Sequence, residues 1–83
     1  NQPQAALDAT EAGLRINPRS LSLLLLRTEA LRHLGRPLDA QAVAREALAI
    51  APDHADVLAA LGWALIDQRQ HRAALVPLAE SLR

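Results

Sequence analysis

Three histidines and one neighbouring aspartate are the residues of this sequence that could carry chemistry. His33, His54 and His71 fall at one predicted helix end and in two predicted turns, and their spacing matches no metal-ligand motif. Asp53 beside His54 could act as an acid–base pair, but an aspartate just before a helical stretch is more simply its N-cap. The sequence contains no glycine-rich phosphate loop and no nucleophile elbow. We therefore predict no catalytic residue, no metal site and no cofactor, so the chain is not expected to be an enzyme.

The composition indicates an all-helical chain with tight contacts between helices. Hydrophobic residues make up 51% of the 83 positions, and most are the strong helix formers alanine and leucine. Nine basic and nine acidic side chains give a formal net charge of zero, which argues against a nucleic-acid groove or an anionic membrane surface. The absence of cysteine excludes disulfides and thiolate metal sites and fits the periplasm or the cytoplasm. No apolar run reaches the roughly 18 residues of a membrane span.

A 34-residue repeat organises the sequence, because Pro18 and Pro52 lie 34 residues apart (52 − 18). Small residues superpose on small ones at this interval, and large apolar residues superpose on large ones: Ala6 on Ala40 and Ala74, Leu14 on Leu48 and Leu82, Leu24 on Leu58, and Leu31 on Leu65. A period of this size is typical of a solenoid, in which each unit buries its apolar face against its neighbours.

Turn and capping signals predict five helices, at about residues 3–16, 21–34, 37–50, 54–68 and 72–82. Asn17-Pro18 ends the first helix, Ser20 caps the second and Gly35 ends it in a left-handed turn. Pro77 would break the last helix unless that helix begins near residue 73 or 74. Helical spacing predicts the inward face of each helix. These faces are, in the first helix, Ala6, Leu7, Thr10, Gly13 and Leu14; in the second, Leu21, Leu24, Thr28 and Leu31; in the third, Ala40, Val43, Ala44, Ala47 and Leu48; in the fourth, Leu58, Leu61, Gly62 and Leu65; and in the fifth, Ala74, Leu75, Leu78 and Leu82.

The pattern resembles the tetratricopeptide repeat. The residues that carry the resemblance are Leu58, Leu61-Gly62, Leu65 and Ala74, and, one repeat earlier, Gly35, Ala40, Ala47-Leu48, Ile50 and Pro52. The sequence departs from the family pattern at Arg27, Thr28, Gly13, Ser81 and Arg69, the last of which replaces the turn glycine.

The resemblance implies an all-α, right-handed superhelical solenoid of antiparallel helix pairs. Residues 1–18 would be the second helix of a partial repeat, residues 21–54 a full repeat and residues 55–83 a near-complete one. Because the chain begins in mid-repeat, we expect it to be a piece of a longer protein. Its basic residues are all arginine, which we interpret as the coding bias of a GC-rich bacterium.

The resemblance also implies a concave groove, lined by the first helix of each pair, that holds a peptide or helix of a partner protein. The groove positions that we expect to contact the partner are Leu25, Glu29 and Arg32 in the second helix and Ala59, Trp63, Ile66 and Asp67 in the fourth. Where the chaperone-binding branch of the family grips a terminal carboxylate with Lys, Asn and Arg, this chain has Leu25, Glu29, Ala60 and Trp63. The resemblance therefore favours a mixed groove with an apolar floor (Leu25, Trp63, Ile66) and a charged rim (Glu29, Arg32, Asp67).

Trp63, the one aromatic residue, is the expected anchor for a partner, since tryptophan is enriched among residues that dominate binding energy. Packing against a neighbouring repeat would suit the same side chain, and Leu25 and Leu26 present the same choice. Both interpretations stay open from the sequence.

Three functions fit these observations. The first is a protein-interaction scaffold in a larger bacterial assembly, secretion or polysaccharide-export protein. The second is a repeat array attached to an enzyme such as a glycosyltransferase, where it would position the substrate. The third is an RNA-binding repeat, which the neutral charge disfavours. The compartment stays open, with the bacterial periplasm slightly favoured over the cytoplasm.

We expect the isolated chain to be marginally stable, or to associate with itself through its terminal helices. A solenoid generally needs about three repeats and polar end caps, and this chain holds fewer. Leu75, Leu78 and Leu82 are expected to face the place where a further repeat would sit. Light scattering combined with a thermal melt tests this expectation. A monodisperse monomer with a high melting temperature would contradict it.

Overall fold

The computed structural model describes residues 2–69 and 71–82, with the backbone alone described for residues 71–75. Within these ranges the chain forms five helices and no strand: α1 (Gln2–Ile16), α2 (Leu21–His33), α3 (Pro37–Ile50), α4 (Ala55–Asp67) and α5 (His71–Ser81). Each helix begins and ends within one residue of its predicted bounds. The predicted all-α fold class is therefore confirmed.

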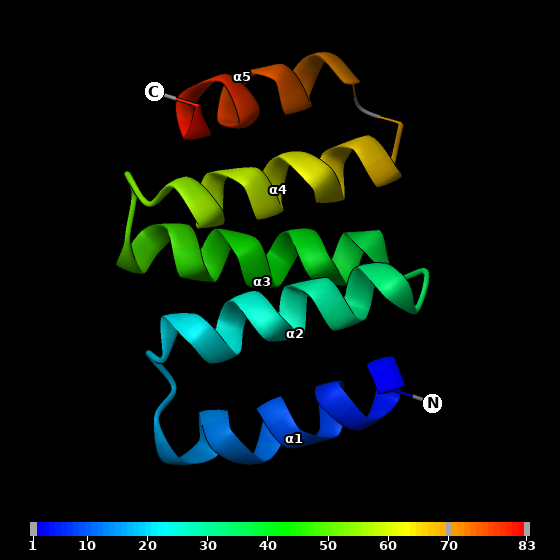
Figure 1. Ribbon diagram of the computed structural model, residues 1–83, viewed down its shortest axis with the longest axis vertical. Coiled ribbons are helices and arrows are strands. Elements are labelled where there is room, and N and C mark those ends of the chain that lie inside the picture. The colour runs from blue at the N-terminus through cyan, green and yellow to red at the C-terminus, as the bar shows by residue number, and fades with distance from the viewer. Residues whose placement is uncertain (1, 70, 83) are drawn as a thin grey trace.

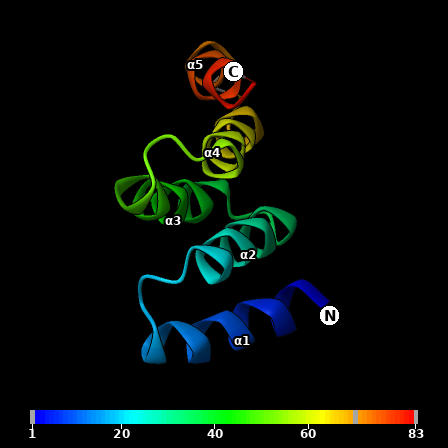
Figure 2. The same ribbon diagram turned by 60° about the vertical axis from the view of Figure 1, so that its left-hand side comes forward.

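The helices stack in chain order, with α1 at one end of the molecule and α5 at the other (Figure 1). Each helix packs against the next one along the chain, and α2 also contacts α4. The turned view shows α3 displaced to one side of the stack (Figure 2). As a result, α2 and α4 lie side by side on the opposite side, although 34 residues separate equivalent positions in the two helices.

Three capping residues were predicted, Ser20, Gly35 and Asp53, and the structure confirms the first two. The Ser20 hydroxyl accepts a hydrogen bond from the Leu23 amide at 3.4 Å, which satisfies a free donor in the first turn of α2. At the other end of α2, Gly35 adopts a φ of 74°. The Gly35 amide donates to the Arg32 carbonyl at 3.0 Å and the Arg36 amide to the Leu31 carbonyl at 2.9 Å. This pair of bonds is the Schellman motif.

The predicted cap of α4 is wrong by one residue. His54, not Asp53, is the N-cap, and its Nδ1 accepts a hydrogen bond from the Asp56 amide at 3.2 Å. Because α4 begins at Ala55, Asp53 lies one position too early to reach the free amides of the first turn. Asp53 is exposed in the turn that joins α3 to α4.

The core depends on small residues that let the helices approach closely. Ala40, Ala44 and Ala47 of α3 are fully buried and carry only a methyl group. In mid-α4, a Cβ added at Gly62 would lie 2.7 Å from Cδ2 of Leu78, too close for an ordinary contact. The expectation that Gly62 marks a helix crossing is therefore confirmed, and α5 is the crossing helix.

Several predicted inward faces need correction. Val57, Ala64 and Ala30 are buried although no predicted stripe included them, because α2 and α4 each pack against three other helices. Leu48 is only partly buried. Leu82, which follows the end of α5, is 86% exposed although the predicted inward face included it. The predicted side-chain positions of Ala74 and Leu75 lie outside the described residues.

The last helix differs from the expectation in two respects. It runs from His71 through Pro77, which is buried inside the helix rather than in its first turn. Proline has no amide hydrogen, so this helix lacks one internal hydrogen bond. Leu78 packs against the buried cluster of Ala44, Leu61 and Leu65, so it faces the core rather than the place of a further repeat.

The departures Thr28 and Arg69 from the family pattern each have a visible consequence. The buried Thr28 hydroxyl donates to the Leu24 carbonyl at 2.9 Å, so burial leaves no unpaired donor. Arg69 lies 34 residues after Gly35 and adopts a φ of 63°, in the left-handed region that glycine tolerates and other residues rarely enter.

Leu65 and Leu48 test the difference between a fully and a partly buried position. Leu65 is 4% exposed within the core, so Leu65→Ala should lower the free energy of unfolding by about 2–5 kcal/mol. Leu48→Ala should cost distinctly less, because part of its side chain already contacts water in the folded state. Urea unfolding followed by circular dichroism measures both values. Equal losses in the two variants would contradict this packing.

Arg69→Gly should raise the free energy of unfolding by about 0.5–1 kcal/mol, because glycine adopts the required φ without steric cost. The reciprocal variant Gly35→Arg is the matched control at the equivalent position of the preceding repeat, and it should destabilise the chain. Thermal melts of both variants and the parent give the comparison. Glycine also adds entropy to the unfolded chain, so a loss of stability larger than the roughly 0.5–1 kcal/mol of this entropic cost would contradict the left-handed conformation at this turn.

Candidate functional site

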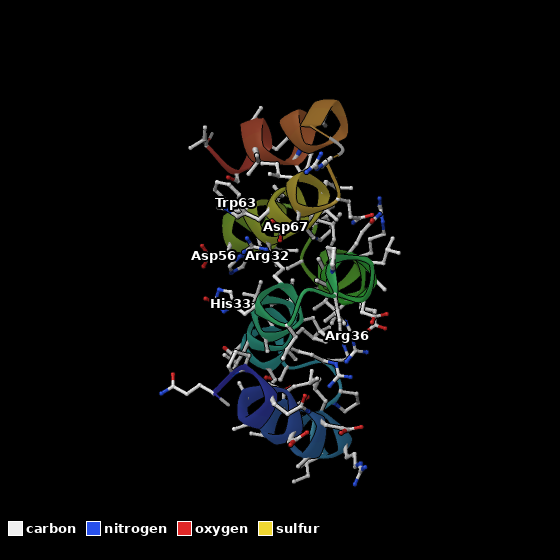
Figure 3. The ribbon with its side chains drawn as sticks, turned by 90° about the vertical axis from the view of Figure 1, so that its right-hand side faces the viewer. Arg32, His33, Arg36, Asp56, Trp63 and Asp67 are labelled. Carbon is white, nitrogen blue, oxygen red and sulfur yellow. The ribbon has the colours of Figure 1, made fainter. Side chains whose placement is uncertain are left out.

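A hollow of about 300 Å³ lies between α2 and α4. Its lining comes from the two helices in equal measure: Leu25, Thr28, Glu29 and Arg32 of α2, and Asp56, Ala59, Ala60 and Trp63 of α4. Arg32, Asp56 and Trp63 lie on the side of the stack away from Arg36, which precedes α3 (Figure 3). The hollow therefore belongs to the face on which α2 and α4 lie side by side.

The spacing of three and four residues brings these side chains to one face of each helix. At the 34-residue interval Leu25 corresponds to Ala59 and Glu29 to Trp63, and all four residues line the hollow. Ala59 and Ala60 extend no further than Cβ, which leaves open space between the longer side chains of Leu25 and Trp63.

Arg32 joins the two helices across this face. Its Nε donates to Oδ2 of Asp67 at 2.8 Å, and its guanidinium carbon lies 5.9 Å from the centroid of the Trp63 ring. The Arg32 and Asp67 side chains are 24% and 33% exposed, so water screens the pair and its contribution to stability is at most about 1 kcal/mol. The main effect of the pair is on position: Arg32 contacts both Asp67 and the tryptophan ring, so it holds these two side chains of α4 next to α2.

Trp63 is 47% exposed, which is unusual for the largest apolar side chain of the chain. One part of its surface lies next to Arg32, and another lines the hollow. Folding therefore positions the ring without burying it.

Most of the predicted groove residues lie together. Leu25, Glu29, Arg32, Ala59 and Trp63 line the hollow. Asp67 does not line it and is connected to it through its ion pair with Arg32.

Ile66 differs from the prediction. It does not line the hollow and is partly buried against the cluster of Ala44, Leu61 and Leu65. Ile66 contacts this core cluster, whereas Asp56, Ala59, Ala60 and Trp63 of the same helix line the hollow. Conversely, Thr28 was expected in the core alone, and it is buried but also lines the hollow. The sequence indicates this second role by spacing: Thr28 lies four residues before Arg32 and Glu29 lies three before it, so all three share one face of the helix.

A second hollow, of about 230 Å³, lies between α1 and α2 and shares Glu29 with the first. Its other lining residues are Gln2, Pro3, Ala6, Leu26, Ala30 and His33. Leu26 is 43% exposed and Leu25 is partly covered by the core cluster around Leu24. The two neighbouring leucines of α2 therefore line different hollows: Leu25 lines the α2–α4 hollow and Leu26 the α1–α2 hollow. Glu29 lines both hollows and lies at the boundary between them.

The described residues contain no group of three or more His, Cys, Asp or Glu side chains arranged to hold a metal ion. His54 caps α4, and His33 lines the hollow between α1 and α2. The side chain of His71 lies outside the described residues. In the same part of the chain, no helix has both the length and the apolar character that crossing a membrane requires.

Neither a protein-family model nor a curated protein sequence matches the chain. Among solved structures it is similar to "MamA MSR-1 C2", a protein with a tetratricopeptide-like domain, at 21% sequence identity and a TM-score of 0.87. The match covers 96% of this chain and 46% of the other, so the chain spans less than half of that protein's length. A likeness at this level of identity establishes the fold alone. The chain therefore has a tetratricopeptide-like fold, with five stacked helices in its described residues.

Proposed function

We propose that this chain is a protein-interaction scaffold, which binds a segment of a partner protein in the hollow between α2 and α4. The observation that carries the proposal is Trp63, a large ring that is 47% exposed and lines a hollow with an otherwise small and apolar floor. A side chain of this kind loses water when a partner covers it, and tryptophan is the residue type most often found at the energetic centre of such contacts.

The arrangement of the site supports binding by a preformed surface. Arg32 restricts the Trp63 ring from one side, and Asp67 restricts Arg32 through the 2.8 Å ion pair. A ring that is already positioned loses little conformational freedom on binding, so more of the burial energy is available for affinity.

The bound segment would be an extended peptide or the apolar face of a helix, because both fit a trough between two packed helices. We further propose that the scaffold belongs to a larger bacterial protein involved in assembly, secretion or polysaccharide export. The tetratricopeptide-like fold supports a scaffold, since the apolar surfaces of repeat arrays are typically used for extended contacts.

Trp63→Ala should weaken binding by about 2 kcal/mol or more, roughly 30-fold in Kd. Peptides selected from a random displayed library by the parent chain provide the ligand, and calorimetric titration of each variant gives the affinity. The matched control is Leu38→Ala, which removes another exposed apolar side chain from α3, outside both hollows next to α2. It should bind like the parent.

Circular dichroism separates a lost contact from a lost fold. Trp63→Ala should keep the helical signal of the parent, because about half of the side chain is already in water. Equal affinity of Trp63→Ala and parent would exclude the hollow as the binding site. A collapsed fold in this variant would show that Trp63 is a core residue.

A further inference from the structure

Two carboxylates without ion-pair partners border the hollow between α2 and α4. Glu29 and Asp56 line it and are exposed. The arginine ion pairs found among the described residues are Arg32 with Asp67 and Arg36 with Asp39, so neither of these two acids takes part in one. Because Asp67 already compensates Arg32, the hollow carries two uncompensated negative charges on a chain whose formal net charge is zero.

The floor beneath these charges is apolar and contains an aromatic ring. Leu25, Ala59, Ala60 and Trp63 provide hydrocarbon surface, and Trp63 already attracts the guanidinium of Arg32 at 5.9 Å. Lysine and arginine combine an apolar stem with a cationic head, so they match an apolar floor with an acidic rim. The volume of about 300 Å³ is roughly twice that of a cavity that accepts benzene, which leaves room for such a side chain.

The hollow between α1 and α2 gives the partner a second place to bind, next to the one that would hold its cationic side chain. Glu29 borders both hollows, and the α1–α2 side offers the apolar surface of Leu26, Ala30 and Ala6. A segment that lies across α2 would therefore meet an acidic hollow on one side of Glu29 and an apolar hollow on the other.

We propose that the partner segment is basic and amphipathic: it places a lysine or arginine between Glu29 and Asp56, and an apolar side chain in the hollow between α1 and α2. This inference rests on the function proposed above and adds the chemistry of the partner. The same charges disfavour an acidic peptide or a phosphate backbone, because like charges would be brought together.

The composition of selected peptides is the first test. A random library of displayed short peptides is selected on the parent chain, and the sequences recovered are compared with the unselected library. The proposal expects enrichment of lysine and arginine next to apolar residues. One arginine-containing peptide is then synthesised together with its citrulline analogue, which keeps the shape and removes the charge. The analogue should bind at least about threefold more weakly.

Matched variants locate the charge that the peptide recognises. The double variant Glu29→Gln with Asp56→Asn removes both carboxylates from the hollow and should weaken the arginine peptide by about fivefold or more. It should also reduce the sensitivity of binding to added salt, because surface charges are screened by ions. The control is Glu46→Gln with Glu80→Gln, which removes two carboxylates from α3 and α5, outside both hollows. The control should bind like the parent.

Fluorescence of Trp63, the one aromatic residue of the chain, reports these titrations from within the hollow. Recovered peptides without basic enrichment, or an unchanged affinity in the hollow double variant, would overturn the basic partner and leave the scaffold function in place. If no peptide binds, or if binding is unaffected by Trp63→Ala, both proposals are wrong. Circular dichroism of each variant confirms that it is folded before its affinity is compared.

Discussion

The close approach of helices at small residues is the constraint on which the rest of this structure depends. The fully buried alanines of α3 bring α2 and α4 within contact of each other, and Gly62 allows Leu78 of α5 to pack directly on the backbone of α4. A larger side chain at any of these positions would separate the layers, and overpacking in a core typically costs about 1–3 kcal/mol. The spacing of the helices follows from residues that have almost no side chain.

The hollow between α2 and α4 is a consequence of the same constraint. Because α3 is displaced to one side, α2 and α4 present neighbouring faces, and residues at repeat-equivalent positions line one hollow. Those residues are not identical: Glu29 corresponds to Trp63, and Leu25 to Ala59. The repeat thus supplies the geometry, while the differences between its copies supply the aromatic ring, the open space and the negative charge.

The sequence predicted the helices and the grouping of Leu25, Glu29, Arg32, Ala59 and Trp63 on one face, because both depend on patterns that are local and periodic. Pro18, Gly35 and Pro52 mark turns by their own backbone preferences, and the spacing within α2 and α4 decides which side chains share a face. Periodicity could not decide how many neighbours each helix has. For this reason the burial of Val57 and the contact of Ile66 with the core cluster were not predicted. The link from Arg32 to Asp67 and Trp63 was also missed as an interaction, because it joins different helices at distances that only the folded chain defines.

The central claim is that the α2–α4 face binds a partner segment, and chemical-shift mapping by NMR tests it most directly. A uniformly ¹⁵N-labelled chain is titrated with a peptide selected on it, and the backbone amide and Trp63 indole signals are followed. The shifted signals should cluster at Leu25, Glu29, Arg32, Ala59 and Trp63. Shifts confined to α3, or to the exposed ends of the stack around Ile16 and Leu82, would contradict it.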